Sequence, residues 1–153
     1  MSRGDKAYEL FLAGYNCTQA VVGAFADVIG MDFDAAVRFG SGFGGGVGRL
    51  REVCGTFSGA VIAINVLYGY SDPKNVKAKA GLYARIQELA AKFRQDNGSI
   101  ICKELLGLSK PEGSPVPEAR TAEYYKKRPC PELCRYSANM VEEYIREHPP
   151  IKE

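Results

Sequence analysis

Five cysteines are the residues of this chain best suited to chemistry: Cys17, Cys54, Cys102, Cys130 and Cys134. A thiolate can attack a disulfide or an oxidant, and it can also ligate a metal ion. Their spacing matches no known metal signature, because the chain has no Cys-x2-Cys pair and its single histidine, His148, lies in a Pro-rich tail. An odd number of cysteines also leaves one thiol outside any complete set of disulfides. Redox chemistry, metal ligation and simple burial therefore remain open.

Four of the five cysteines fall within one turn of a predicted helix N-terminus, and these are Cys17, Cys54, Cys102 and Cys130. Unpaired backbone N–H groups and the positive end of the helix dipole stabilise a thiolate at such positions. The pattern predicts lowered thiol pKa values and one polar pocket that gathers the four sulfurs. Cys134 lies one helical turn beyond Cys130 and is expected to be outside the set. Packing is the simple alternative, since cysteine is among the most often buried residue types.

A glycine-rich segment, GSGFGGGVG over residues 40–48, precedes Cys54. It formally matches G-x-G-x-x-G, but no strand precedes it, so a dinucleotide site is disfavoured. Backbone N–H groups of such a loop can bind an anion where a helix begins. The candidate ligand-binding residues are therefore Gly44, Gly45, Gly46, Arg49 and Arg51. The arginines could instead depress the pKa of Cys54, or the glycines could only let the chain cross closely over packed helices.

The elements that must position these residues are predicted to be helices. Apolar residues at three- and four-residue spacings predict helices over residues 5–13, 17–29, 33–39, 53–68, 73–96, 100–106 and 131–145. Residues 53–68 are nearly free of charge and are predicted to form a central, buried helix. Residues 108–117 hold three of the 8 prolines and are predicted to form an exposed loop. The sequence thus predicts a single all-α domain over residues 1–153, a compact bundle of about six or seven helices.

Composition narrows the class of protein. The 153 residues are 46% hydrophobic and 25% charged, as in a globular domain rather than a disordered chain. A net charge of +2 disfavours binding to nucleic acid by bulk charge. The N-terminus lacks the apolar run of a secretory signal, and the longest apolar stretch is too short to span a membrane. We therefore expect a cytoplasmic protein, in which structural disulfides are disfavoured.

The order of these features resembles a known family, C_GCAxxG_C_C, whose members are described as redox-active. The resemblance spans about residues 16–145 and rests on Cys17, the FGGG run at 43–46, the CGTFSG stretch at 54–59, Cys102 and Cys130. It implies a small bacterial or archaeal protein with redox activity and no assigned substrate. In the family motif a glycine precedes the cysteine, whereas here Cys54 precedes Gly55, so the sulfur stands one residue early if Gly59 is the anchor.

Two functions of different classes follow. In the first, a thiol redox protein, Cys54 attacks, Cys17 resolves the mixed intermediate, and the remaining two cysteines form a second pair or complete the site. The same four sulfurs, those of Cys17, Cys54, Cys102 and Cys130, could ligate a metal ion or an iron–sulfur cluster. The expected partner is a redox protein or a small-molecule oxidant, with no nucleic acid and no membrane.

The second function is a non-enzymatic helical module with packed or metal-holding cysteines, whose glycine loop binds an anion or a partner. The basic, aromatic stretch at 124–128 offers a surface for such a partner.

Overall fold

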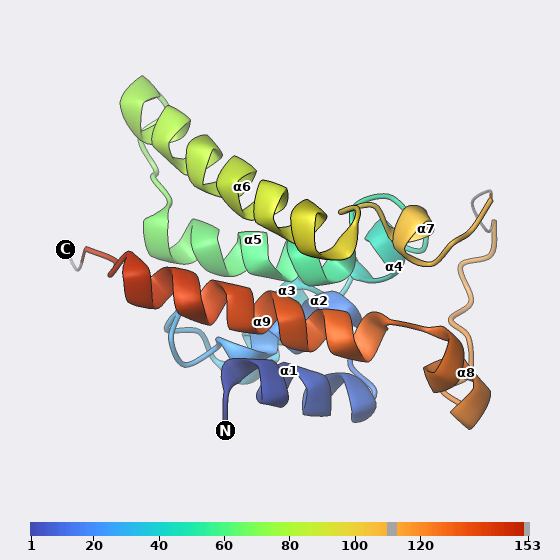
Figure 1. Cartoon of the computed structure of the whole chain (residues 1–153). Coiled ribbons are helices and arrows are strands. Elements are labelled where there is room, and N and C mark those ends of the chain that lie inside the picture. Colours follow the sequence, from blue (N-terminus) through green and yellow to red (C-terminus); the bar gives the residue numbers. More distant parts are fainter. Residues whose placement is uncertain (110–112, 152–153) are drawn as a thin grey trace.

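The computed structural model describes residues 1–109 and 113–151 of the chain. Within them the secondary structure is helical, apart from one isolated β-bridge between Val53 and Ile101. The helices are α1 (Arg3–Leu12), α2 (Cys17–Ala24), α3 (Phe33–Phe39), α4 (Gly44–Val47), α5 (Gly55–Tyr68), α6 (Val76–Asn97), α7 (Cys102–Leu105), α8 (Ala122–Lys127) and α9 (Cys130–Glu147). The predicted all-α class is confirmed (Figure 1). The short helices α4 and α8 are not predicted from the sequence.

Side-chain caps start several helices where the sequence predicts them. Asn16 accepts a hydrogen bond from the backbone of Gln19, whose side chain accepts one from the backbone of Asn16 in return. Asp32 caps α3 in the same way, by accepting from the backbone N–H of Ala35. Gly98 ends α6 in the left-handed conformation, with φ at 92°. Each cap satisfies backbone groups that a helix end otherwise leaves unpaired.

Two helix boundaries differ from the prediction by three residues or more. α2 ends at Ala24 rather than near residue 29, and Arg3 of α1 donates a hydrogen bond to the Ala24 carbonyl at 2.9 Å. This contact supplies a partner for one of the carbonyls at the helix end. α6 begins at Val76 rather than near residue 73, because Asn75 accepts from the backbone of Ala78 and so acts as the N-cap. The predicted start signal at residues 71–73 forms a turn instead.

The apolar helix α5 lies at the centre of the molecule, with α6 and α9 on either side of it (Figure 1). Phe57 on α5 meets Phe93 on α6 edge to face, with ring centroids 5.7 Å apart. At Gly59 the helix approaches α2 so closely that a Cβ atom there would lie 2.7 Å from the Cβ of Val21. The same Cβ atom would lie 3.0 Å from the backbone oxygen of Thr18, so the lack of a side chain at Gly59 lets the backbone of α2 approach α5.

The first half of α6 extends beyond this core (Figure 1). Its buried residues, Leu89, Ala90 and Phe93, all lie in the second half. The earlier part of the predicted apolar stripe stays exposed, as at Tyr83, which is 56% exposed. In the described residues, no helix has both the length and the apolar character required to cross a lipid bilayer.

Candidate functional site

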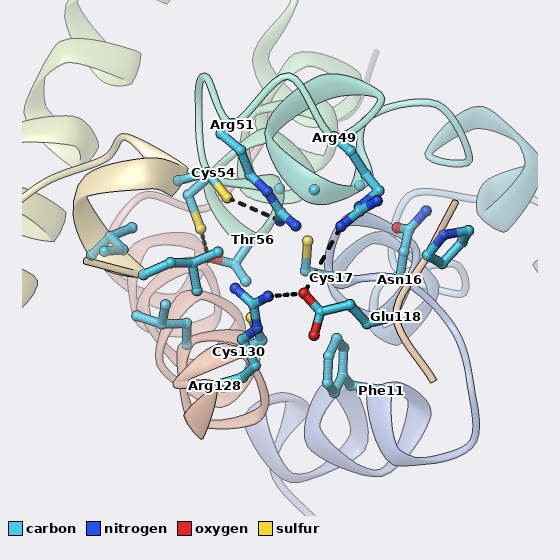
Figure 2. A pocket seen from close by; sticks show the side chains of 18 of the residues that line it. Phe11, Asn16, Cys17, Arg49, Arg51, Cys54, Thr56, Glu118, Arg128 and Cys130 are labelled. Carbon is cyan, nitrogen blue, oxygen red and sulfur yellow. Dashed lines mark hydrogen bonds and ion pairs between the residues drawn. The ribbon is translucent and has the colours of Figure 1, made fainter. Parts of the chain in front are cut away.

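Four cysteines line one cavity of about 380 Å³. Cys17, Cys102 and Cys130 are the first residues of α2, α7 and α9, and Cys54 is the residue before α5. The beginnings of α5 and α9 lie at one end of the molecule beside α7 (Figure 1), and the side chains around the cavity are shown in Figure 2. The structure thus brings together the four cysteines that the sequence singled out. Their catalytic roles stay a prediction.

Cys134 has a different environment. It is fully buried in α9, and its sulfur lies 3.8 Å from the backbone carbonyl oxygen of Cys17, to which it can donate a weak hydrogen bond. It is not among the residues that line the cavity. Cys134 therefore contacts the backbone of Cys17 from a position outside the cavity.

The glycine-rich loop passes over the cavity in a left-handed turn. The residues with positive φ are Gly45 (68°), Gly46 (72°), Val47 (66°), Gly48 (57°), Arg49 (64°) and Arg51 (61°). A left-handed conformation costs ~1–2 kcal/mol for each residue that is not glycine. Backbone hydrogen bonds hold the turn, among them Arg51 to Gly45 at 3.1 Å and Glu52 to Gly46 at 2.9 Å. A segment predicted only to be irregular is therefore a specific, strained conformation, of the kind that gathers at functional sites.

Gly46 shows how tightly this turn is packed. A Cβ atom at Gly46 would lie 2.6 Å from the backbone nitrogen of Glu52 and 2.7 Å from the Cβ of Cys102. No side chain can occupy that space without moving the backbone. The predicted glycine positions Gly44 and Gly45 line the cavity, whereas Gly46 is buried and sets the distance between the loop and α7.

Cys17 is the thiol toward which the loop directs a backbone N–H group. Burial raises the pKa of the Cys17 thiol above its ordinary value, and the neighbouring Cys102 thiol raises it further. Hydrogen bonds from the backbone N–H groups of Gly45, Thr18 and Cys17 itself act in the opposite direction. The Cys17 sulfur also packs directly on Gly55, where any side chain would collide with it. Cys17 nevertheless keeps part of its surface open to the cavity.

The predicted lowering of thiol pKa values is wrong for Cys17, Cys54 and Cys130. Burial raises the pKa of Cys54 and of Cys130 to about 12, with the Cys17 thiol as the next cause in both cases. Burial also raises the pKa of Cys134 well above its ordinary value. Removal of a thiolate from water, together with repulsion between neighbouring sulfurs, outweighs the N–H groups at the helix starts.

The pKa of Cys54 is raised to about 12, and no arginine is among the main causes of this shift. The alternative in which Arg49 and Arg51 depress the pKa of Cys54 is therefore wrong. Arg51 extends toward Cys102 instead, with its Nη1 atom 3.7 Å from that sulfur. Arg49 donates to the backbone carbonyl of Ser114 at 2.7 Å. Cys54 lies within hydrogen-bond distance of the Thr56 hydroxyl, at 3.2 Å, as Figure 2 shows. Both arginines line the cavity, so their place beside a ligand remains a prediction.

An exposed segment, residues 113–121, closes one side of the cavity, and we call it the strap. Arg49 binds the strap carbonyls of Ser114 and Val116 and lies 3.9 Å from the Glu118 carboxylate. Arg128 forms a second ion pair with Glu118. Figure 2 shows Glu118 between these two arginines, facing the cavity. The strap is therefore attached to the body of the protein by charged side chains rather than by an apolar core.

Arg120 fixes the other end of the strap. It donates to the carbonyl oxygens of Phe11 at 2.6 Å and Tyr15 at 2.9 Å, and its guanidinium lies 3.9 Å from the centre of the Phe11 ring. Sequence reasoning missed Glu118, Arg120 and Arg128 as cavity residues. Arg128 belongs to the basic stretch interpreted as a partner surface, and part of the predicted exposed loop, residues 110–112, lies outside the described residues.

The arrangement of the thiols does not fit a metal site. Across residues 1–109 and 113–151, no group of three or more His, Cys, Asp or Glu side chains is placed to hold a metal ion. A four-thiolate site requires its sulfurs to converge on one point, so we derive no step through a metal or an iron–sulfur cluster. His148 stacks on Tyr144 at the end of α9, with ring centroids 4.2 Å apart, and is not a cavity residue.

Comparison with known proteins supports the resemblance seen in the sequence. A search of curated proteins and a search of solved structures gave no match. A family model described as "Putative redox-active protein (C_GCAxxG_C_C)" matches residues 15–144. That span includes the cavity cysteines, the glycine loop and the strap. The chain therefore belongs to the C_GCAxxG_C_C family.

Proposed function

We propose that this protein is a thiol–disulfide oxidoreductase in which Cys17 attacks a small disulfide and Cys54 resolves the intermediate. The observation that carries the proposal is the position of Cys17, which is only partly buried and lines the cavity beside the glycine loop. The backbone N–H group of Gly45 lowers the pKa of Cys17 against the larger effect of burial, and such N–H groups favour the thiolate, which is the nucleophile. Cys54 is only 6% exposed, and no arginine is among the main causes of its pKa shift. We therefore assign the attack to Cys17 and not to Cys54, the residue that the sequence favours.

Cys54 is the natural resolving residue. Cys17 is the thiol with the largest effect on the pKa of Cys54, so the two sulfurs lie within each other's electrostatic range. Gly55, which follows Cys54 in the chain, contacts the Cys17 sulfur directly. Because Gly55 has no side chain, nothing at that position separates the beginnings of α2 and α5.

The reaction has two exchange steps. The Cys17 thiolate attacks one sulfur of a disulfide R–S–S–R′, which forms Cys17–S–S–R and releases R′–S⁻. The Cys54 thiolate then attacks the Cys17 sulfur, which releases R–S⁻ and leaves a Cys17–Cys54 disulfide. Two electrons pass from the cysteine pair to the substrate, and the two thiol protons pass through solvent to the released thiolates. An external dithiol, itself oxidised to a disulfide, restores the reduced protein.

The reduced protein, prepared without oxygen, can be treated with neutral hydroxyethyl disulfide and analysed by mass spectrometry. We expect an internal Cys17–Cys54 disulfide in the wild-type protein and a stable mixed disulfide on Cys17 in Cys54→Ser. Cys17→Ser should lose the reaction, while Cys134→Ser should keep it, as a matched change of a thiol outside the cavity. Equal reaction of Cys17→Ser and the wild-type protein would overturn the assignment, as would five thiols that all stay reduced.

A further inference from the structure

Two arginines of the cavity wall are more deeply buried than the carboxylate that pairs with them. The side chains of Arg49 and Arg128 are 14% and 11% exposed, whereas that of Glu118 is 44% exposed. A guanidinium withdrawn from water is stable only with anionic or polar partners. Glu118 belongs to the exposed strap, which has no helical hydrogen bonds of its own. The carboxylate is therefore the member of this group that can leave at the lowest cost.

The position of Glu118 relates it to the proposed chemistry. Its carboxylate points toward the cavity that also holds the Cys17 sulfur, as Figure 2 shows. Guanidinium groups bind carboxylates through charge-assisted hydrogen bonds of defined geometry. An incoming carboxylate that took the place of Glu118 would keep both arginines paired. The rest of such a ligand would then lie in the cavity, within reach of Cys17.

We propose that Arg49 and Arg128 form a binding site for a carboxylate of the substrate, and that Glu118 occupies this site while the protein is empty. The substrate class is then a small disulfide with a carboxylate near its sulfur atoms. The volume of about 380 Å³ suits a small molecule rather than a folded protein. This inference rests on the proposed function for the disulfide part, while the carboxylate site stands on the arginine geometry alone.

Three disulfides of similar size test the site: dithiodipropionate, which carries two negative charges, neutral hydroxyethyl disulfide, and cystamine, which carries two positive charges. We expect the wild-type protein to react fastest with dithiodipropionate and slowest with cystamine. Glu118→Gln should raise the rate with dithiodipropionate by about tenfold, the effect of removing one competing charge-assisted contact. Any change in its rate with hydroxyethyl disulfide should be smaller than this rise. Glu123→Gln, an exposed change in α8, should behave as the wild-type protein does.

A second measurement does not depend on thiol chemistry. Adipate, a dicarboxylate without sulfur, should raise the unfolding temperature of Glu118→Gln more than that of the wild-type protein or of Glu118→Asp. If no disulfide reacts but adipate binds in this order, the oxidoreductase proposal fails and the carboxylate site stands. If Cys17 reacts at equal rates with all three disulfides, and Glu118→Gln changes neither rates nor adipate binding, the carboxylate site is overturned.

Discussion

The stability of the fold should fall steeply in alkali, because burial keeps its thiols protonated. Cys54 has a pKa of about 12 in the folded protein against an ordinary value of 9.0. Between these values the unfolded chain releases its proton while the folded chain keeps it, so the free energy of unfolding decreases as pH rises. From neutral pH to about pH 10, a shift of this size at one cysteine removes about 1.4 kcal/mol of stability. The loss begins near the unfolded value and is complete near the folded one.

Urea denaturation at neutral pH and at about pH 10 measures this loss, with Cys54→Ala compared to the wild-type protein. The variant should lose about 1.4 kcal/mol less than the wild-type protein across the interval, whatever its stability at neutral pH. Val22→Ala is the matched control, since it shortens a fully buried side chain that does not ionise. Its stability should be lower at both pH values, with the same loss between them as the wild-type protein. Equal losses in Cys54→Ala and the wild-type protein would refute the argument, because Cys54 would then ionise alike in the folded and unfolded chains.

Two further predictions concern the backbone around the cavity. Val47→Gly should raise the free energy of unfolding, measured by calorimetry, by about 1 kcal/mol. The change removes the left-handed strain at φ 66°, which outweighs the flexibility that glycine adds to the unfolded chain. A lower stability would show that contacts of the Val47 side chain outweigh the strain of its backbone. Gly55→Ala should lower stability by about 1–3 kcal/mol and change the alkylation rate of Cys17, because its Cβ would meet the Cys17 sulfur. Gly81→Ala, with nothing within 4 Å of its added Cβ in α6, should instead add about 0.5–1 kcal/mol, and equal effects of the two changes would contradict the contact.

The location of the thiols was predictable because it depends on local signals. Asn16 starts α2 through its own side chain, so the residue after it, Cys17, must lie in the first turn. Pro131 is favoured in the first turn of a helix, and it fixes Cys130 at the start of α9. Such caps act within three or four residues of sequence. The sequence therefore placed four sulfurs at helix starts without any knowledge of how the helices pack.

The pKa values of the same thiols depend on packing and were not predictable. A helix N-terminus lowers a thiol pKa by an amount limited to its few N–H groups, whereas burial depends on everything that surrounds the sulfur. For Cys54 the surroundings include the Cys17 thiol, which comes from another helix. The strap is a second case. Glu118 reaches Arg49 across a large separation in sequence, and no local pattern marks that pairing.

The strained glycine loop gives the clearest reason why local rules fail here. A β-branched residue such as Val47 rarely adopts positive φ, so its own preference opposes the observed turn. The turn persists because Arg51 and Glu52 donate to Gly45 and Gly46, and because Lys103 and Cys102 donate to the carbonyls of Arg51 and Glu52. The loop is thus held by α7, which itself carries a cavity cysteine.

These features together suggest how the proposed site separates selection from reactivity. Exchange of the Glu118 carboxylate for a substrate carboxylate replaces one negative charge with another beside Arg49 and Arg128, so the local charge around Cys17 stays the same. Since a neighbouring charge is one of the main causes of a thiol pKa shift, substrate binding leaves the protonation of Cys17 set by burial and by the Gly45 N–H group. On this reasoning the arginines decide which disulfide enters, while the depth of the cavity decides how readily the thiol attacks. A change at Glu118 should therefore alter substrate preference. The pH dependence of the Cys17 reaction should stay the same in Glu118→Asp, which keeps the charge, and should move to lower pH in Glu118→Gln, which removes it.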